Sequence, residues 1–481
     1  MKDKINIFKL GKISSVIVPI LLFVFVISFN YSKPFGFFRE SNPAMVCINA
    51  ILWSSNPLLE KLHVPISSYS FDSTAQPSTQ FYNTIVSFGS GWFRLPFFFF
   101  KICSLSPNEH SIRIFSLIWL TITLLTAYLL AKQITNAQIN NTVIIYFTLI
   151  FYVFNAATLW YHVQGYLHEI AVLPFYFTGW WLFSKYLKTP TFKILLEIVF
   201  VLFTAIQFDW LPFFQAMVMS AYLLFSKSKT KKWAFLLPAI AVTAGMFYIF
   251  YHYVQWAGLS AYVNHLQEKF LKRTIGGGKL QLIHGLNYNF NIAIFYSTGF
   301  GLLAVTFLIC VYKKILRYPI IWMMIAAAML HHIVFWGFSI EHDHGVVKMA
   351  FPLAFAGACF IAEFRPFKRF ILASLIVVSN IGLYFFLHNF YTRPGMYSNP
   401  DFCYQVGTYI HNQIPSNKEI VFINTEGKYY QQIEFYAQKQ YVLAGSASEA
   451  KLILNTNYPK ASGYFLVISN GKIDKQILSN Q

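Results

Sequence analysis

Long apolar runs separated by short polar connections fill most of the first 387 residues of the chain. A bilayer core about 30 Å thick requires roughly 20 apolar residues in a helix, and most of these runs approach that length. The pattern therefore predicts a polytopic α-helical membrane protein with about eleven transmembrane helices. The predicted spans are 14–30, 112–131, 141–158, 168–184, 194–208, 210–225, 233–252, 290–312, 319–338, 346–362 and 370–387.

Two apolar stretches depart from the pattern of one span per run. Asp209 and Pro212 interrupt residues 194–225, which form either one long hairpin or two short spans. The run from Trp92 to Phe100 is too short to cross a bilayer, so we expect a helix that lies in the membrane interface.

The tail from about residue 388 onward loses the membrane composition. Polar amphipathic stretches alternate there with short β-like runs, which predicts a small α/β domain over 388–481 with a partly parallel sheet. The tail contains no Gly-rich phosphate-binding loop, so we assign it no cofactor. The amphipathic stretches are 401–413, 428–437 and 446–454, and the β-like runs are 419–424, 441–443 and 463–468.

The charge balance indicates how the chain is oriented. It carries 37 Lys and Arg against 18 Asp and Glu, a net charge of +19, although only 11% of its residues are charged. Soluble domains average about 25% charged residues, and no basic stripe typical of nucleic-acid binding is present. The Lys and Arg residues instead collect at alternating ends of the predicted spans, which places the N-terminus in the cytoplasm and the tail outside.

This topology defines a transmembrane domain over 1–387, with large outer loops at 31–111 and 253–289. Three of the five cysteines, Cys47, Cys103 and Cys403, are then outside, where a disulfide is chemically possible. Their spacing indicates no particular pairing and no metal motif.

Acidic side chains collect on the predicted outer side, where a charge near the membrane is costly and is often functional. Glu169 and Asp209 lie at span ends in loops without Lys or Arg, which favours a function over a solvated loop acid. Glu40 follows the first span and Asp72 lies in the first outer loop. For Glu40, a solvated loop acid is a comparable interpretation. For Asp72, an Asx-turn is a comparable interpretation.

A basic run beside three glycines in the second outer loop has the chemistry to hold phosphate, although contact with lipid headgroups is the alternative. Four further residues beside the tenth span are candidate ligands for a divalent metal, or else caps at the interface. The predicted substrate- and phosphate-binding residues are Asp209, Lys269, Lys272, Arg273, Lys279 and Lys348, and the candidate metal ligands are Glu341, His342, Asp343 and His344.

The stretch 108–119, Asn-Glu-His-Ser-Ile-Arg-Ile-Phe-Ser-Leu-Ile-Trp, resembles the second-span signature of GT-C glycosyltransferases. These polytopic enzymes are related to protein mannosyltransferases and the lipid A aminoarabinose transferase. The resemblance implies a catalytic acid soon after the first span, matched by Glu40, and an acid that opens the fourth span, matched by Glu169. Asp72 stands near the place of the family's His-Pro-Pro-Leu motif, of which the His and the second Pro are missing here.

The resemblance also implies a function. We expect the chain to move a sugar from a polyprenyl-phosphate carrier to an acceptor on the outer face, with Glu40, Asp72 or Glu169 as the catalytic base. A divalent metal is the one cofactor in question, and the acceptor is a glycan, a lipid or a protein. The resemblance suggests a bacterial inner membrane, although the topology would serve equally in an endoplasmic reticulum.

Two other classes of function remain open. A glycolipid or polysaccharide transporter or flippase commonly shows internal repeats and charges at the membrane midplane. No repeat is visible here, and the acids gather on one side, which favours the transferase. A non-catalytic membrane scaffold that displays the tail is the third interpretation.

Overall fold

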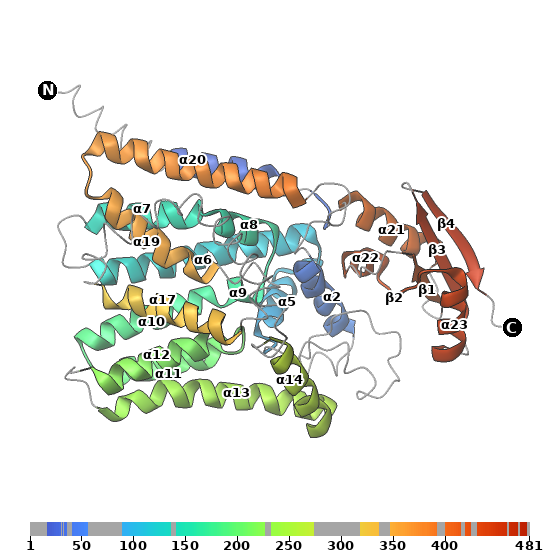
Figure 1. Ribbon diagram of the computed structural model, residues 1–481, viewed down its shortest axis with the longest axis horizontal. Coiled ribbons are helices and arrows are strands. Elements are labelled where there is room, and N and C mark those ends of the chain that lie inside the picture. Colours follow the sequence, from blue (N-terminus) through green and yellow to red (C-terminus); the bar gives the residue numbers. More distant parts are fainter. Residues whose placement is uncertain are drawn as a thin grey trace. The chain divides into compact units, whose positions relative to one another are not determined.

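The computed structural model shows the helices and strands of Figure 1, and it forms two compact units. The first unit comprises Met1–Ser32, Ser116–Ile249 and Gln267–Leu387, and the second Lys33–Phe115, Phe250–Leu266 and His388–Gln481. The described residues are 17–29, 31, 33–35, 41–55, 89–135, 141–226, 232–273, 318–335, 347–391, 400–414, 419–424, 431–458, 461–469 and 472–478.

Three of the described helices are long and apolar enough to cross a membrane. They are Glu109–Thr135, which is α6; Trp233–Trp256, which includes most of α13 (Leu236–Ala257); and Pro366–Phe386, within α20 (Pro366–Tyr391). All three agree with predicted spans. The predicted span 290–312 lies outside the described residues.

The predicted span 141–158 is a bent pair of helices, α7 (Asn141–Val153) and α8 (Ala156–Gln164), which meet at 56°. Asn155 starts α8, because its side chain accepts a hydrogen bond from the backbone N–H of Ala157 at 3.0 Å. The amide oxygen of Asn380 in α20 accepts the neighbouring N–H of Ala156 at 3.3 Å. Side chains thus satisfy the backbone groups that the bend would leave unpaired in an apolar environment.

The stretch 194–225 forms two short helices, α11 (Phe192–Ala205) and α12 (Leu211–Phe225). Pro212 stands in the first turn of α12, where proline is tolerated because that turn has unpaired N–H groups. Four further helices of the first unit are α9 (His168–Ala171), α10 (Leu173–Lys188), α17 (Pro319–Val334) and α19 (Ala350–Ile361).

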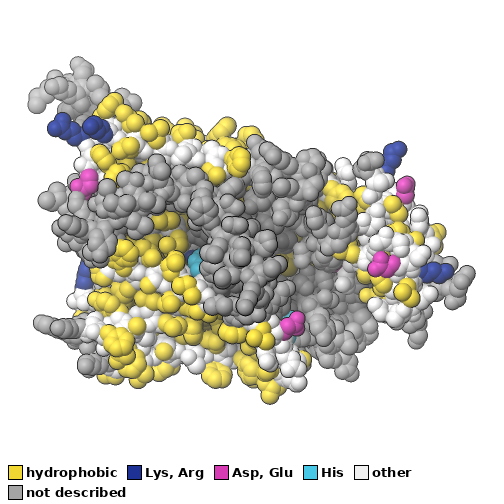
Figure 2. Space-filling model, viewed as in Figure 1, with side chains coloured by type: hydrophobic (Ala, Val, Ile, Leu, Met, Phe, Trp, Pro, Cys, Tyr) yellow, Lys and Arg dark blue, Asp and Glu magenta, His cyan; other side chains and the backbone are white. Residues whose placement is uncertain are grey.

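Large apolar side chains are exposed along the helices of the first unit, and Figure 2 shows them as yellow atoms over much of the described surface. Phe200 in α11, Phe247 in α13 and Phe370 in α20 are 70%, 66% and 71% exposed. A soluble protein would rarely expose so many large apolar groups. Helices with apolar outer faces are the expected form of a bundle that contacts lipid.

The tail carries a four-stranded mixed sheet in the order β2-β1-β3-β4. Strand β1 (Ile420–Ile423) pairs in parallel with β2 (Tyr441–Leu443) and β3 (Gly463–Ser469), as expected from alternating helices and strands. Strand β4 (Lys472–Leu478) pairs antiparallel with β3 and was not predicted. Its sequence is mostly polar because it is an exposed edge strand, and charged side chains are common on such edges.

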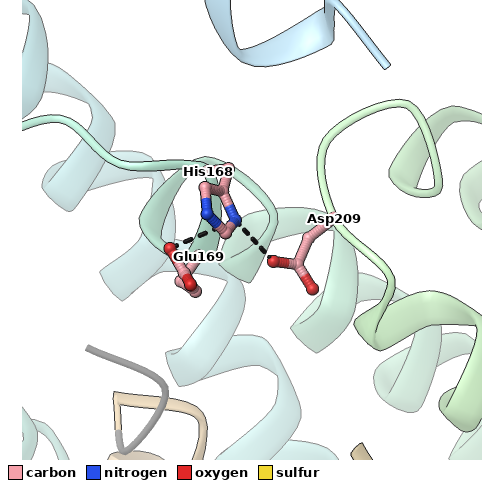
Figure 3. A group of neighbouring side chains, drawn as sticks. All are labelled: His168, Glu169 and Asp209. Carbon is pink, nitrogen blue, oxygen red and sulfur yellow. Dashed lines mark hydrogen bonds and ion pairs between the residues drawn. The ribbon is translucent and has the colours of Figure 1, made fainter. Parts of the chain in front are cut away.

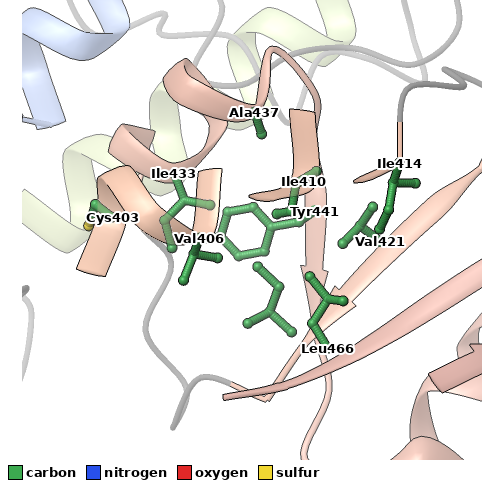
Figure 4. Close-up of a cluster of buried hydrophobic side chains, with 10 residues drawn as sticks. Cys403, Val406, Ile410, Ile414, Val421, Ile433, Ala437, Tyr441 and Leu466 are labelled. Carbon is green, nitrogen blue, oxygen red and sulfur yellow. The ribbon is translucent and has the colours of Figure 1, made fainter. Parts of the chain in front are cut away.

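The central strand β1 is buried on both faces, because helices of the tail cover the sheet on each side. Val421 and Ile423 face the cluster in Figure 4, which also contains residues of α21 (Pro400–Gln413) and α22 (Gln431–Ala437). Ile420 and Phe422 face α23 (Ala447–Asn457) on the opposite side. The buried side chains of Figure 4 are Cys403, Val406, Ile410, Ile414, Val421, Ile423, Ile433, Ala437, Tyr441 and Leu466.

Within the second unit, α22 contacts residues from the predicted first outer loop. The hydroxyl group of Tyr436 donates a hydrogen bond to Glu109 and accepts one from the backbone N–H of Phe35 at 2.6 Å. Helix α22 also packs on α2 (Ser41–Ser55), which in turn packs on α5 (Gly91–Cys103), the helix expected at Trp92 to Phe100. The second unit therefore joins the tail to loop residues that the sequence analysis assigned to the domain 1–387.

The three cysteines that were candidates for a disulfide are all free thiols. Cys47 and Cys403 are buried, whereas Cys103 is exposed at the end of α5. Burial, together with the negative charge of Glu109, raises the pKa of the Cys47 thiol well above its ordinary value. Cys47 is therefore an unreactive neutral thiol at physiological pH.

Candidate active site

A buried group of ionisable side chains lies in the first unit, where α9 begins. His168 and Glu169 open this short helix after residues 165–167, of which Gly165 and Leu167 have extended backbones. The side chain of Glu169 is fully buried, and His168 is only 6% exposed. A fully buried carboxylate needs nearby partners of positive or polar character, because its desolvation is costly.

Asp209 approaches the same point from the connection between α11 and α12. Its Oδ1 atom accepts a hydrogen bond from the backbone N–H of Leu211 at 2.7 Å, in the first turn of α12. Asp209 precedes the N-cap residue Trp210, and a carboxylate is favoured there because the first N–H groups of a helix lack partners and carry a partial positive charge. The capping interaction therefore fixes the direction of the carboxylate.

His168 lies between the two carboxylates, as Figure 3 shows. Its Nδ1 atom is 2.7 Å from Oδ2 of Asp209 and 3.1 Å from Oε2 of Glu169. The contact with Asp209 is a hydrogen bond, and an ionised carboxylate can only accept one, so Nδ1 carries the proton and donates it to Asp209. Sequence position brings His168 next to Glu169, but only the fold brings Asp209 to the same nitrogen.

Two basic side chains face the other oxygen of Asp209. Its Oδ1 atom lies 3.7 Å from Nε2 of His331 in α17 and 3.8 Å from Nζ of Lys348, in the helical turn before α19. Lys348 is fully buried, and His331 is 2% exposed. The rings of Phe214 and Phe335 pack edge-on against His331, with centroids 5.4 and 5.3 Å away.

The surroundings of Asp209 favour its ionised form. Burial alone would raise the pKa of Asp209, but the Lys348 ammonium group and the hydrogen bond with His168 outweigh that effect. The pKa of Asp209 therefore lies below its ordinary value. The site thus contains a carboxylate whose ionised form is favoured, within reach of two imidazoles and one ammonium group.

The structure brings together Glu169, Asp209 and Lys348, which the sequence analysis had identified separately. His168 and His331 were not predicted as site residues. His168 could have been found as the neighbour of Glu169, whereas His331 gives no comparable signal in the predicted span 319–338. Lys269, Lys272 and Arg273 stand in α14 (Leu259–Arg273) with side chains that are not described, and Glu40, Asp72, Lys279, Glu341, His342, Asp343 and His344 lie outside the described residues.

His168, Glu169 and Asp209 also have the composition of a metal site. Their potential ligand atoms all lie within 4.8 Å of one another. The measured separations of 2.7 and 3.1 Å are close to the edge of an octahedron with bonds of about 2.1 Å, which is roughly 3 Å. One imidazole and two carboxylates suit Zn²⁺ or Mn²⁺, so the residues fit a divalent ion that would take the place of the proton on Nδ1.

The fold is similar to that of solved glycosyltransferases, whereas no family model and no curated protein matches the sequence. ArnT from Cupriavidus metallidurans bound to undecaprenyl phosphate has a TM-score of 0.61 at 9% identity, over 94% of this chain and 92% of that chain. ArnT in the apo state has a TM-score of 0.63 at 9% identity, over 95% and 93%. The Archaeoglobus fulgidus oligosaccharyltransferase in a complex with Zn and sulfate has a TM-score of 0.56 at 15% identity, over 94% and 68%.

These similarities extend over nearly the whole chain, and both neighbours are GT-C glycosyltransferases. The chain therefore has the helical membrane fold of the GT-C glycosyltransferases. The resemblance seen in residues 108–119 is confirmed at the level of the fold. Identities of 9–15% are too low to assign the role of any single residue.

Proposed function

We propose that the protein is a membrane glycosyltransferase that moves a sugar from a polyprenyl-phosphate carrier to an acceptor on the outer face. The observation that carries the proposal is the buried group His168, Glu169 and Asp209 within a GT-C fold. Buried acids are expensive in a helical membrane protein and are retained mainly where they serve a function.

The solved neighbours support the choice of donor and acceptor. One ArnT structure is bound to undecaprenyl phosphate, and one oligosaccharyltransferase structure is tethered to an acceptor peptide with the NVT sequon. For this chain we infer a lipid-linked donor and an acceptor that is a glycan, a lipid or a protein. The fold does not discriminate among these acceptors, because each presents a hydroxyl or amine to the sugar.

In the proposed reaction, an acceptor hydroxyl or amine attacks the anomeric carbon of the sugar. A new bond forms from the anomeric carbon to the acceptor, and the bond to the phosphate oxygen of the carrier breaks. A carboxylate accepts the proton that the acceptor loses, and polyprenyl phosphate departs with the electron pair of the broken bond. Glu40, Asp72 and Glu169 remain the candidate bases, of which Glu169 is the one with described surroundings.

His168 and Asp209 would act on Glu169 and on its proton. The imidazole lies 3.1 Å from Glu169, and Asp209 orients the imidazole through the 2.7 Å contact with Nδ1. A divalent ion held by His168, Glu169 and Asp209 would supply positive charge for the departing phosphate. Lys269, Lys272, Arg273, Lys279 and Lys348 are the proposed phosphate-binding residues of the chain itself.

The proposed outer location is supported by the composition of the second unit. It combines residues 33–115, 250–266 and the tail, which the distribution of Lys and Arg had independently placed on one side of the membrane. Segments far apart in sequence can form one compact unit only if they emerge on the same side. An eleven-span topology with an outer α/β tail in a bacterial inner membrane is therefore part of the proposal.

Release of polyprenyl phosphate from a polyprenyl-phosphate sugar by the purified protein tests this function. We expect Glu169→Gln to reduce turnover by at least about 100-fold while folding is kept, since one proton acceptor commonly contributes 10²–10⁴-fold. Glu197→Gln is the matched control, because Glu197 is a partly exposed acid in α11 that does not belong to the His168, Glu169 and Asp209 group. Glu40→Gln and Asp72→Asn decide which further acid takes part.

The transporter interpretation predicts a different result from the same preparation. Protein reconstituted in vesicles would then move the lipid-linked sugar between leaflets without releasing the lipid phosphate. Full activity of all three acid variants would instead show that the assigned site is wrong.

A further inference from the structure

Lys348 is a buried cation that faces the candidate metal ligands without being one of them. Its Nζ atom lies 3.8 Å from Oδ1 of Asp209, while Oδ2 of the same carboxylate faces His168. An ammonium group is a donor only, so it cannot coordinate a metal ion. Its charge nevertheless acts on any second cation at Asp209, because like charges repel strongly where water is excluded.

The position of this ammonium group is fixed by its surroundings. Lys348 is fully buried, and Nζ lies 3.2 Å from Nδ1 and 3.1 Å from Nε2 of His331. Nζ is therefore within hydrogen-bonding distance of both ring nitrogens of His331. The rings of Phe214 and Phe335 in turn pack edge-on against His331.

The charge count at the site then depends on Lys348. With neutral imidazoles, the described group carries two negative charges on Glu169 and Asp209 and one positive charge on Lys348. The affinity of a site for a divalent cation increases with the negative charge of its ligands. Lys348 therefore reduces the net charge available to a metal from two negative charges to one.

We propose that Lys348 is an internal counter-cation that competes with a divalent metal ion for Asp209 and thereby sets the metal affinity of the His168, Glu169 and Asp209 group. The relevance of this affinity to sugar transfer rests on the proposed function, whereas the competition itself follows from the site. With Lys348 in place, Asp209 is balanced without a metal ion, and metal binding is correspondingly weak.

Binding of Mn²⁺ to the purified full-length protein, followed by electron paramagnetic resonance of the free ion, tests the proposal. Lys348→Met and Lys348→Gln remove the charge, and Lys348→Arg keeps it. We expect both neutral variants to bind Mn²⁺ at least ten-fold more tightly than the wild type, equivalent to about 1.4 kcal/mol. Lys348→Arg should remain close to the wild type, and adding Glu169→Gln to Lys348→Met should abolish the gain.

Several results would overturn the proposal. One is Mn²⁺ binding by the neutral variants that is no tighter than that of the wild type, and another is a gain in the arginine variant. Failure of both neutral variants to fold even in the presence of Mn²⁺ also contradicts it, because the metal ion should replace the lost positive charge. Release of polyprenyl phosphate by the wild type is measured separately, with and without a metal chelator. If the neutral variants bind Mn²⁺ more tightly but the wild type releases no polyprenyl phosphate, the result contradicts the proposed function alone.

Discussion

Replacing Asp209 by Asn is expected to destabilise the first unit, because it removes the negative charge that balances a fully buried ammonium group. The side chain keeps its shape, and its oxygen can still accept the N–H of Leu211 at the start of α12. The loss therefore reports on charge rather than on helix capping. Two interactions disappear, one with Lys348 and one with His168.

The magnitude follows from the distances. At 3.8 Å, the attraction between Asp209 and Lys348 is about 4 kcal/mol for an effective dielectric constant of about 20. The asparagine retains part of the hydrogen bonding to His168, and water relaxes around the unpaired ammonium group. Loss of one partner of a buried ion pair typically costs about 3–5 kcal/mol, and we expect Asp209→Asn to fall in this range.

Unfolding in mixed micelles by titration with sodium dodecyl sulfate, followed by tryptophan fluorescence, measures this loss. Lys348→Met should cost a similar amount, and the double variant should cost at least about 2 kcal/mol less than the sum of the two. An Asp209→Asn variant within about 0.5 kcal/mol of the wild type, or strictly additive effects, would refute the reasoning. Glu197→Gln serves again as the control for a partly exposed acid.

Three further predictions concern packing and exposure. Gly179→Ala should lower the stability of the first unit and the yield of folded protein. The added Cβ would lie 2.6 Å from Nε2 of Gln215 in α12, and this buried side chain could move away only by breaking its hydrogen bond to the carbonyl oxygen of Tyr176; unchanged melting in detergent would contradict this. Leu454→Ala should destabilise the tail by about 2–5 kcal/mol, since Leu454 is fully buried against the sheet. The variant should therefore be cleaved faster by a protease within the tail, and an unchanged cleavage rate would argue against this packing. A membrane-impermeant maleimide added to intact cells should label Cys103 but not the buried Cys47. Labelling of Cys47 would show that α2 is not packed as described. Protection of Cys103 would argue against the proposed topology.

Much of the fold could be predicted because its signals are local. The length of an apolar run and the position of Lys and Arg depend only on neighbouring residues, so α6, α13 and α20 were located to within a few residues. The tail helices and three of its strands follow from their periodicity in the same way. Strand β4 escaped prediction because an exposed edge strand does not need apolar residues, and its identity depends on pairing with β3.

The candidate site shows the same division. Glu169 and Asp209 could be identified from the sequence, because an acid at the end of an apolar run is costly whatever its partners are. Their common partner His168 and the basic residues His331 and Lys348 could not be grouped, since α9, α17 and the turn before α19 are separated by many residues.

The sequence by itself therefore determined that this chain is a helical membrane protein with acids at the ends of its spans, since burial in lipid constrains every residue of a span. Only the tertiary structure decided that two acids, two histidines and one lysine share a buried site, with one oxygen of Asp209 toward His168 and the other toward Lys348. The physical reason is that the rotation of each packed helix about its axis, and its depth in the membrane, decide which side chains meet. Many sequences with the same pattern of apolar runs would bring other residues together.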